Sequence, residues 1–528
     1  MIRTLKTGIV LGAAIAIVMV SAEAGAQATM VDYESSAKAA QIRDSAAWRL
    51  AFRPALSVLQ QTVSQLRSAP GLAPTMLRDV DELIAKAAMQ PEADARRTLW
   101  QAVTLLNGVA WTPEQELLGA LALKTPAPIW TGTRDQLTIE ALYATRAAGS
   151  AGYSVNLFSS EPTSSATPKK GKLVRVLAHG KLAGKYPQSV PTNLNGVPDG
   201  SYLLLGEVKT ASGAITQVAQ PVYVVRQLQK RYEDFNADFG RIQGHNEARW
   251  IAEYPYALAQ AINAGNREVI SYDFPQAFER SRQILASLKA GQDPVRQAKG
   301  LQNRAYLFEE TGELIPYQIY VPGTWSSGKQ WPLVVALHGA NLDETNMLMR
   351  DGGRMQQLAE EHGFIVVSPL GYRLNSAYGS ERGFSESIVG KQFERRARSE
   401  KDVLRVTELV EQEYNIDARR RYLTGNSMGG GGTWWIGGRH ADRWAAIAPA
   451  AYGGVLPEDV PNLARVPILA VVGDRDEVGM LERVRASLAT LHAGGVSPEY
   501  IEVPGGTHAG AFETALPRIF QFFDKHAK

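Results

Sequence analysis

Cysteine is absent from the 528 residues of the chain. This absence excludes disulfide scaffolds, thiolate nucleophiles, cysteine-ligated zinc, iron–sulfur clusters and the lipidated N-terminus of bacterial lipoproteins. A covalent catalyst built from this chain therefore needs a serine, threonine, lysine or carboxylate as its nucleophile.

An excess of charge of one sign is also missing. The 56 lysines and arginines against 53 aspartates and glutamates give a formal net charge of +3. This balance lacks the electrostatic footprint of a nucleic-acid-binding protein, so we expect no nucleic-acid partner. Hydrophobic residues make up 45% and charged residues 21%, which argues against both disorder and a multi-span membrane protein.

The apolar run at the N-terminus is short. It covers residues 8–20, whereas a membrane-spanning helix takes about 20 residues, so an uncleaved anchor fits less well than a signal peptide. Arg3 and Lys6 precede the run and the small residues 24–26 follow it, which is the layout of a secretory signal peptide cut near Ala26. We expect an exported protein, periplasmic or extracellular, with no membrane span after cleavage.

Changes in composition along the remaining chain predict several domains, as the length does at roughly 100–200 residues per domain. An Ala-, Leu- and Gln-rich stretch with prolines at helix boundaries gives way to short β-rich runs, and then to another helical pattern. The β-rich part is typical of an antiparallel sandwich of immunoglobulin type. The predicted division is a signal peptide (1–26), a helical region (27–128), an immunoglobulin-like sandwich (129–226), a helical connector (227–302) and a catalytic domain (303–528).

The catalytic domain should contain eight strands. Residues 306–308 and 315–321 flank a Thr-Gly turn and predict an opening hairpin. Six further strands, most of them separated by helical stretches, are expected at 333–337, 365–367, 422–424, 445–448, 468–472 and 500–503. Strands that alternate with helices pair in parallel through crossover connections, so the fold class is α/β with an open, mostly parallel sheet.

The nucleophile is expected at Ser427. This serine lies in the sequence Gly-Asn-Ser-Met-Gly, which follows the strand 422–424 directly and precedes a helical pattern. The G-x-S-x-G motif in this context places the serine on a strained turn, with the two glycines allowing the strand and helix to approach each other.

A serine hydroxyl needs a base, and the base needs an orienting acid. With this motif the chain order is serine, acid, histidine, and His508 lies in the loop between the last strand and the last helix. The acid should follow the penultimate strand, where Asp474 and Asp476 are both present. We prefer Asp476 for its position at the loop tip and expect Asp474 to cap the turn.

Two backbone N–H groups are expected to stabilise the oxyanion, those of Met428, directly after the nucleophile, and of Ala340, after the first central strand. His338 next to the latter is interpreted as a buried structural histidine. The chemistry requires no metal and no cofactor.

Three aromatic residues are candidates for substrate binding. Tyr372 and Tyr378 lie in the long segment 371–398 after the second central strand, at the sheet edge where open α/β folds bind ligands. Trp434, on the nucleophile helix, either lines a pocket for an aromatic substrate or packs that helix against the sheet. Asp402 is expected to cap the start of a helix.

The motifs at 337–339, 369–372, 402–403, 423–430, 473–476 and 506–508 give residues 305–528 a resemblance to the α/β-hydrolase superfamily. Within it, the chain resembles the branch of secreted polyhydroxybutyrate depolymerases, feruloyl esterases and related predicted peptidases. The resemblance implies Ser427, Asp476 and His508 as nucleophile, acid and base. Unlike the extracellular depolymerases, the chain has neither cysteines nor a Thr-rich linker, and this argues against a polymeric substrate.

Three functions remain open at this point. The chain is interpreted as an exported serine carboxylesterase acting on aryl or hydroxyacid esters, with a small-molecule or oligomeric ester as its partner. A serine peptidase resembling prolyl oligopeptidase is the first alternative, and a non-catalytic binding protein on a hydrolase scaffold is the second.

Overall fold

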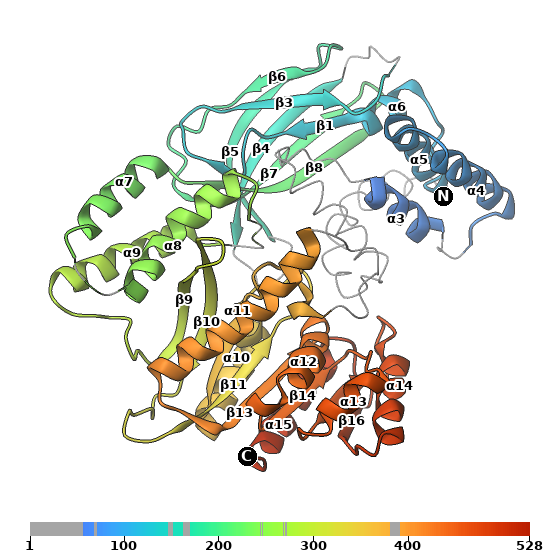
Figure 1. The fold of residues 1–528 in the computed structure, drawn as a ribbon. Helices are drawn as coiled ribbons and strands as arrows, with labels where there is room; N and C mark the ends of the chain where they lie inside the picture. The colour runs from blue at the N-terminus through green and yellow to red at the C-terminus, as the bar shows by residue number, and fades with distance from the viewer. Residues whose placement is uncertain are drawn as a thin grey trace, which may run out of the picture.

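The computed structural model describes residues 56–67, 71–145, 151–161, 169–242, 244, 246–267, 269, 272–380 and 391–528. The predicted signal peptide lies outside these residues. The described chain starts with helices that lead into a β-rich region (Figure 1). The first three pack around a small apolar core, and the last contributes buried leucines to the core of the β-rich region. These helices are α3 (Leu56–Arg67), α4 (Pro74–Ala88), α5 (Glu92–Leu106) and α6 (Pro113–Ala120).

The β-rich region consists of two sheets that share one core. The three-stranded sheet has the order β1-β3-β6, and the five-stranded sheet has the order β2-β8-β7-β4-β5. Buried residues from both sheets, such as Ile139 and Leu204, belong to the same cluster. The strands are β1 (Leu121–Lys124), β2 (Ile129–Trp130), β3 (Gln136–Ala141), β4 (Gly152–Glu161), β5 (Lys169–Lys181), β6 (Gln188–Pro191), β7 (Gly200–Lys209) and β8 (Ile215–Val224).

Two details differ from the predicted sandwich. Strand β1 precedes residue 129, the predicted start of the sandwich, and β2 pairs with β8 in parallel, so the sandwich is not wholly antiparallel. That the sandwich is of the immunoglobulin type stays a prediction.

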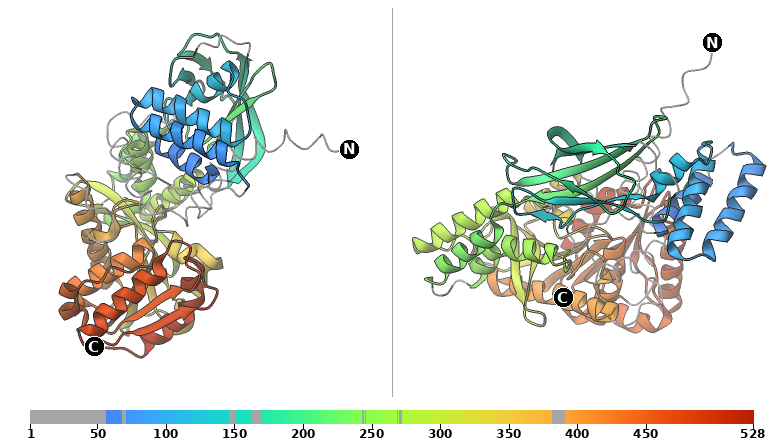
Figure 2. Two further views of the ribbon diagram at one scale, coloured as in Figure 1. Left: turned by 90° about the vertical axis from the view of Figure 1, so that its right-hand side faces the viewer. Right: turned by 90° about the horizontal axis from the view of Figure 1, so that it is seen from above.

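The connector forms the helices α7 (Leu228–Phe239), α8 (Asn246–Asn263) and α9 (Phe274–Lys289). Its core is aromatic, and Tyr256 stacks on Phe235 with the ring centroids 5.2 Å apart. Tyr223 of β8 and Ala305 of the next strand belong to the same cluster. The connector therefore packs against both the sandwich and the C-terminal sheet, and it lies between them in Figure 1 and in the left view of Figure 2.

The C-terminal sheet has eight strands in the order β16-β15-β14-β13-β11-β12-β10-β9. Strand β10 pairs with β9 and β12 in antiparallel fashion, and the other pairs are parallel, which confirms the mostly parallel sheet. The strands are β9 (Gly300–Phe308), β10 (Glu313–Val321), β11 (Trp331–Leu337), β12 (Ile365–Pro369), β13 (Ile416–Asn426), β14 (Ala446–Ala450), β15 (Leu469–Gly473) and β16 (Glu499–Val503).

Helices cover both faces of this sheet, which explains why its central strands are apolar on both sides. Along β11, Val335 contributes to the core on one face and Val334 to the core on the other. Residues of α11 (Lys391–Glu413), α12 (Met428–Arg439) and α14 (Met480–Ala493) belong to the first core. Residues of α10 (Asn346–His362) and α15 (Gly510–Asp524) belong to the second.

The connection from β14 to β15 is short. Its residues 451–468 contain only the 3₁₀ turn η4 (Pro457–Asp459) and the one-turn helix α13 (Val460–Leu463). No cap domain is inserted in this described stretch. Within the described ranges, no helix combines the length and the apolar character that crossing a membrane requires.

Candidate active site

Ser427 lies on a strained turn at the carboxyl end of β13. Its backbone has φ 57° and ψ −121°, and it is the N-cap residue of α12. The flanking glycines make this turn possible, because a Cβ on Gly425 would lie 2.5 Å from the Gly429 carbonyl carbon and one on Gly429 would lie 2.0 Å from the Leu337 oxygen. The turn exposes the hydroxyl at the edge where the parallel strands end.

The three residues predicted for catalysis meet at this edge. His508 Nε2 lies 2.8 Å from Ser427 Oγ, and His508 Nδ1 lies 2.8 Å from Asp476 Oδ2. The second carboxylate oxygen of Asp476 accepts hydrogen bonds from the backbone N–H groups of Val478 and Met480. The Asp476 side chain is fully buried and therefore fixed as an acceptor for the imidazole.

The other aspartate of this loop does not face the imidazole. Asp474 accepts a hydrogen bond of 2.6 Å from the Gly505 N–H and so joins the acid loop to the histidine loop. Glu477 makes a second such link, since its carboxylate accepts the His508 backbone N–H at 3.0 Å. Sequence reasoning missed Glu477, because a side-chain bond to a distant backbone group leaves no local pattern.

The predicted oxyanion donors lie beside the nucleophile. Met428 is the first residue of α12, so its N–H has no acceptor within the helix. Gly339, which precedes Ala340, is so close to Ser427 that a Cβ placed on it would lie 3.6 Å from the serine Cβ. Two N–H groups aimed at a bound carbonyl oxygen stabilise its negative charge, and this role of Met428 and Ala340 stays a prediction.

His338 has the structural role expected of it. It is 0% exposed, and its ring nitrogens lie 2.8 Å from the carbonyl oxygens of Gly339 and Leu370. Burial lowers the pKa of this imidazole, which favours the neutral form.

Comparison with known families matches residues 309–523 to the model of a family described as "Putative esterase". The residues matched are similar to members of this family, and the C-terminal domain is called the esterase domain from here on. The match covers β10 to β16 and all the residues of the candidate site, and it begins after the connector.

Curated relatives match parts of this esterase domain. The bifunctional acetylxylan esterase/xylanase XynS20E of Neocallimastix patriciarum is 30% identical over 173 residues, which are 32% of this chain and 22% of that protein. The S-formylglutathione hydrolase of Arabidopsis thaliana is 24% identical over 163 residues, which are 29% of this chain and 57% of that protein. The chain thus spans less than two thirds of the length of either relative.

Solved structures are also similar at low identity. A thermostable esterase is 18% identical with a TM-score of 0.37, covering 71% of this chain and 90% of its own. A ferulic acid esterase from Anaeromyces mucronatus, solved with ferulic acid, is 18% identical with a TM-score of 0.35, covering 42% of this chain and 89% of its own.

Two of the residues expected to bind substrate are instead part of the core of the esterase domain. Tyr372 is 4% and Tyr378 0% exposed. The Tyr372 hydroxyl donates to Glu313, and the Tyr378 ring packs on Gly432, where a Cβ would lie 2.7 Å from it. The expectation that these tyrosines line the site is wrong, because Tyr378 packs against α12 and Tyr372 packs on Phe308 of β9. Residues 381–390 of the same segment lie outside the described residues.

Trp434 is a packing residue of α12, and its role in substrate binding stays a prediction. Its indole N–H donates to the Tyr452 carbonyl oxygen at 3.0 Å, and the residue is 7% exposed, so it packs α12 onto the loop after β14. It also lines a cavity of about 170 Å³ together with Gly431, Trp435, Tyr452 and Leu463.

Asp402 does not cap a helix, contrary to expectation. It lies inside α11 and is 0% exposed. Its carboxylate accepts the Tyr306 hydroxyl at 2.5 Å and the Tyr372 N–H at 2.8 Å. Burial raises the pKa of Asp402 to about 6.

Among the side chains that the structure describes, no group of three or more His, Asp or Glu is arranged to hold a metal ion.

Proposed function

We propose that the esterase domain is a serine carboxylesterase that works through an acyl-enzyme. The observation that carries this proposal is the continuous hydrogen-bonded chain from Ser427 Oγ through His508 to Asp476. His508 Nε2 takes the hydroxyl proton while Ser427 Oγ attacks the ester carbonyl carbon, and Asp476 stabilises the imidazolium. The N–H groups of Met428 and Ala340 stabilise the oxyanion.

The second half of the reaction uses the same groups. His508 gives its proton to the leaving alkoxide as the bond between the carbonyl carbon and that oxygen breaks. Water then loses a proton to His508 and attacks the acyl-enzyme, and collapse of the second tetrahedral intermediate returns the proton to Ser427 Oγ and frees the acid.

For the substrate we propose aryl or short hydroxyacid esters. The names of the curated relatives, an acetylxylan esterase and an S-formylglutathione hydrolase, support small acyl groups on an oxygen or sulfur leaving group. The short connection between β14 and β15 supports open access, because it inserts no cap. A Ser-His-Asp triad in an open site favours esters over amides. The leaving amine of an amide must be protonated by the imidazolium as the C–N bond breaks, whereas the alkoxide of an ester leaves with less help.

The test compares a p-nitrophenyl ester and a p-nitroanilide with the same acyl group, with Ser427→Ala as the control. We expect kcat/KM for the ester to exceed that for the anilide by at least about 100-fold. An anilide rate equal to or above the ester rate would favour the peptidase. A protein that turns over neither compound and is not labelled by a fluorophosphonate would instead be a binding protein.

We further propose that the protein is exported. The support is the basic start, the apolar run 8–20 and the small residues 24–26. Expression of the full chain in a Gram-negative host should give a periplasmic protein whose measured mass lacks about the first 26 residues. A cytoplasmic protein of full mass would contradict this.

A further inference from the structure

The oxyanion loop, defined as residues 338–341, is attached to the loop that follows β12. The Asn341 backbone N–H donates to Asn375 Oδ1 at 2.8 Å, and Asn375 Nδ2 donates to Asn341 Oδ1 at 2.7 Å. Asn341 has a φ of 58°, a left-handed conformation that costs free energy unless its surroundings stabilise it. The reciprocal amide pair supplies this stabilisation directly after Ala340.

His338, the first residue of the oxyanion loop, also forms hydrogen bonds with the loop that follows β12. His338 Nε2 lies 2.8 Å from the Leu370 carbonyl oxygen, and the Tyr378 hydroxyl donates to the His338 carbonyl oxygen at 3.2 Å. Both ends of the oxyanion loop therefore depend on residues 370–378. The middle of the loop lies against Ser427 through Gly339, so a shift of the loop moves the Ala340 N–H relative to the nucleophile.

We propose that Asn375 is a positioning residue for the oxyanion hole, acting through Asn341 on the Ala340 N–H. This inference rests on the proposed esterase function. The Asn341 N–H shares a peptide plane with the Ala340 carbonyl, so holding this N–H fixes the plane next to the one that carries the Ala340 N–H. A donor that is oriented before the oxyanion forms stabilises the transition state without reorganisation.

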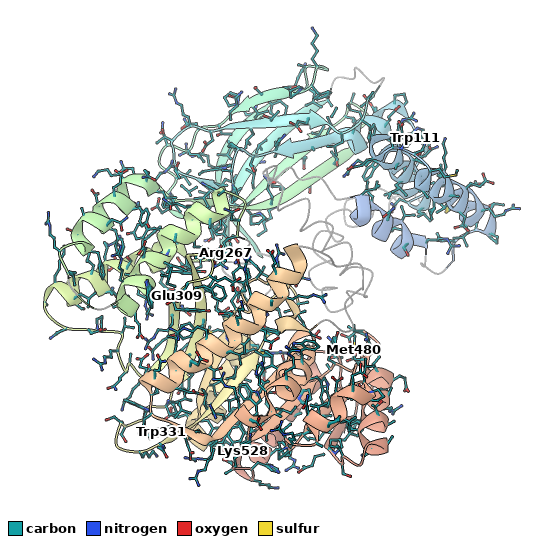
Figure 3. All side chains as sticks on the ribbon, in the orientation of Figure 1. Trp111, Arg267, Glu309, Trp331, Met480 and Lys528 are labelled. Atoms are coloured by element: carbon teal, nitrogen blue, oxygen red, sulfur yellow. The ribbon has the colours of Figure 1, made fainter. Side chains whose placement is uncertain are left out.

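The loop that carries Asn375 is itself held from two sides. Asp402 accepts the Tyr372 N–H, and Arg267 donates to the Tyr372 carbonyl oxygen at 3.1 Å. Arg267 lies outside the family match, and Figure 3 shows its label where the connector meets the esterase domain. The support of the oxyanion loop thus extends from Asn375 into the connector.

The test uses Asn375→Ala in the full chain with a p-nitrophenyl ester and phenylboronic acid, which forms a tetrahedral adduct with the serine. We expect kcat to fall by about 10- to 100-fold with KM changed less than about threefold, since the substrate ground state does not use the oxyanion donors. Affinity for the boronic acid should fall by the same factor as kcat/KM.

Two matched variants accompany it. Asn415→Ala removes an asparagine that donates to the Ser327 and Lys329 carbonyl oxygens near the start of β11, and it should leave kcat and boronic acid affinity unchanged. Asn341→Gly keeps the backbone N–H and tolerates the positive φ, so kcat should fall less than in Asn375→Ala.

A kcat within twofold of wild type in folded Asn375→Ala would overturn the inference, as would a loss of kcat without loss of boronic acid affinity. If Asn375→Ala does not fold, Asn375→Asp replaces it, because the carboxylate still accepts the Asn341 N–H but no longer donates. An intermediate loss of kcat supports the inference, and an unchanged kcat overturns it.

The rate of phosphonylation by a fluorophosphonate separates this inference from the proposed function. If the wild type hydrolyses no ester, the proposed function fails. Slower phosphonylation of Ser427 in Asn375→Ala than in the wild type would still support the positioning role, and equal rates would overturn it.

Discussion

Arg267, in the connection between α8 and α9, donates hydrogen bonds to the carbonyl oxygens of Tyr372 at 3.1 Å and Leu314 at 2.6 Å. The arginine is 5% exposed, and both acceptors belong to the esterase domain. One buried cation therefore joins the connector to the backbone of two segments of the esterase domain. Its removal would take one donor from each of these carbonyl oxygens, and the Tyr372 oxygen would keep its second hydrogen bond, from Arg373 at 2.8 Å. The loss of buried hydrogen bonds from a charged donor is more costly than the loss of an exposed ion pair.

Arg267→Met should accordingly lower the free energy of unfolding by about 3 kcal/mol, because each hydrogen bond from a charged donor contributes roughly 1.5–3 kcal/mol. It should also lower kcat, since the Tyr372 carbonyl belongs to the loop that supports the oxyanion residues. Urea unfolding and ester kinetics measure both effects. Arg282→Met, at an exposed arginine of α9 that pairs with Glu279, is the control and should change neither. Equal stabilities of the two variants would contradict the bridging role.

Ser427→Ala and His508→Ala should each lower kcat on a p-nitrophenyl ester by about 10⁴- to 10⁶-fold, because the two side chains act as one unit. The melting temperature should stay close to that of the wild type, since neither change introduces a new group. His179→Ala, at an exposed histidine of β5, should retain full activity. Normal turnover by a folded Ser427→Ala variant would eliminate the proposed mechanism.

Asp476→Asn should lower kcat by about 10⁴-fold, because the amide favours the wrong tautomer of His508. Asp474→Asn is the matched control, since Asp474 contacts the Gly505 N–H and not the imidazole. Asp474→Asn should lower kcat far less than Asp476→Asn does. Any loss should come from a weaker attachment of the loop that carries His508. The opposite ranking in steady-state kinetics would identify Asp474 as the acid.

Most strands of the esterase domain were predictable because they contain a short apolar run bounded by turn residues, as β15 does. Ser427 and His508 could be found for a similar reason, since the strained turn and the final loop both have local sequence patterns. Tyr372, Tyr378 and Asp402 were misinterpreted because their roles depend on contacts between α11, α12 and the loop after β12. The roles of Asn375 and Arg267 could not be predicted for the same reason, because their hydrogen-bond partners are 34 and 105 residues away in the chain.

The pH dependence of stability should reveal the buried Asp402. Burial raises the pKa of its carboxyl to about 6, above the value of about 3.9 expected in the unfolded chain. Between these values the folded state binds more protons than the unfolded state, so the contribution of Asp402 to stability is complete below about pH 4 and falls as the pH rises through about 6. A shift of roughly two units corresponds to about 3 kcal/mol.

Asp402→Asn removes this titration, so the wild type should lose up to about 3 kcal/mol relative to the variant between pH 4 and pH 7. Urea unfolding of both proteins at several pH values measures how the difference between their free energies of unfolding changes with pH. This change does not depend on the absolute stability of the variant. Glu310→Gln is a control in which stability should change with pH in the opposite direction. Hydrogen bonds from Lys401 and Arg398 lower the pKa of Glu310, so its contribution to the stability of the wild type should increase as the pH rises. Parallel pH profiles for the wild type and Asp402→Asn would show that the carboxylate stays ionised, held so by the Tyr306 hydroxyl and the Tyr372 N–H.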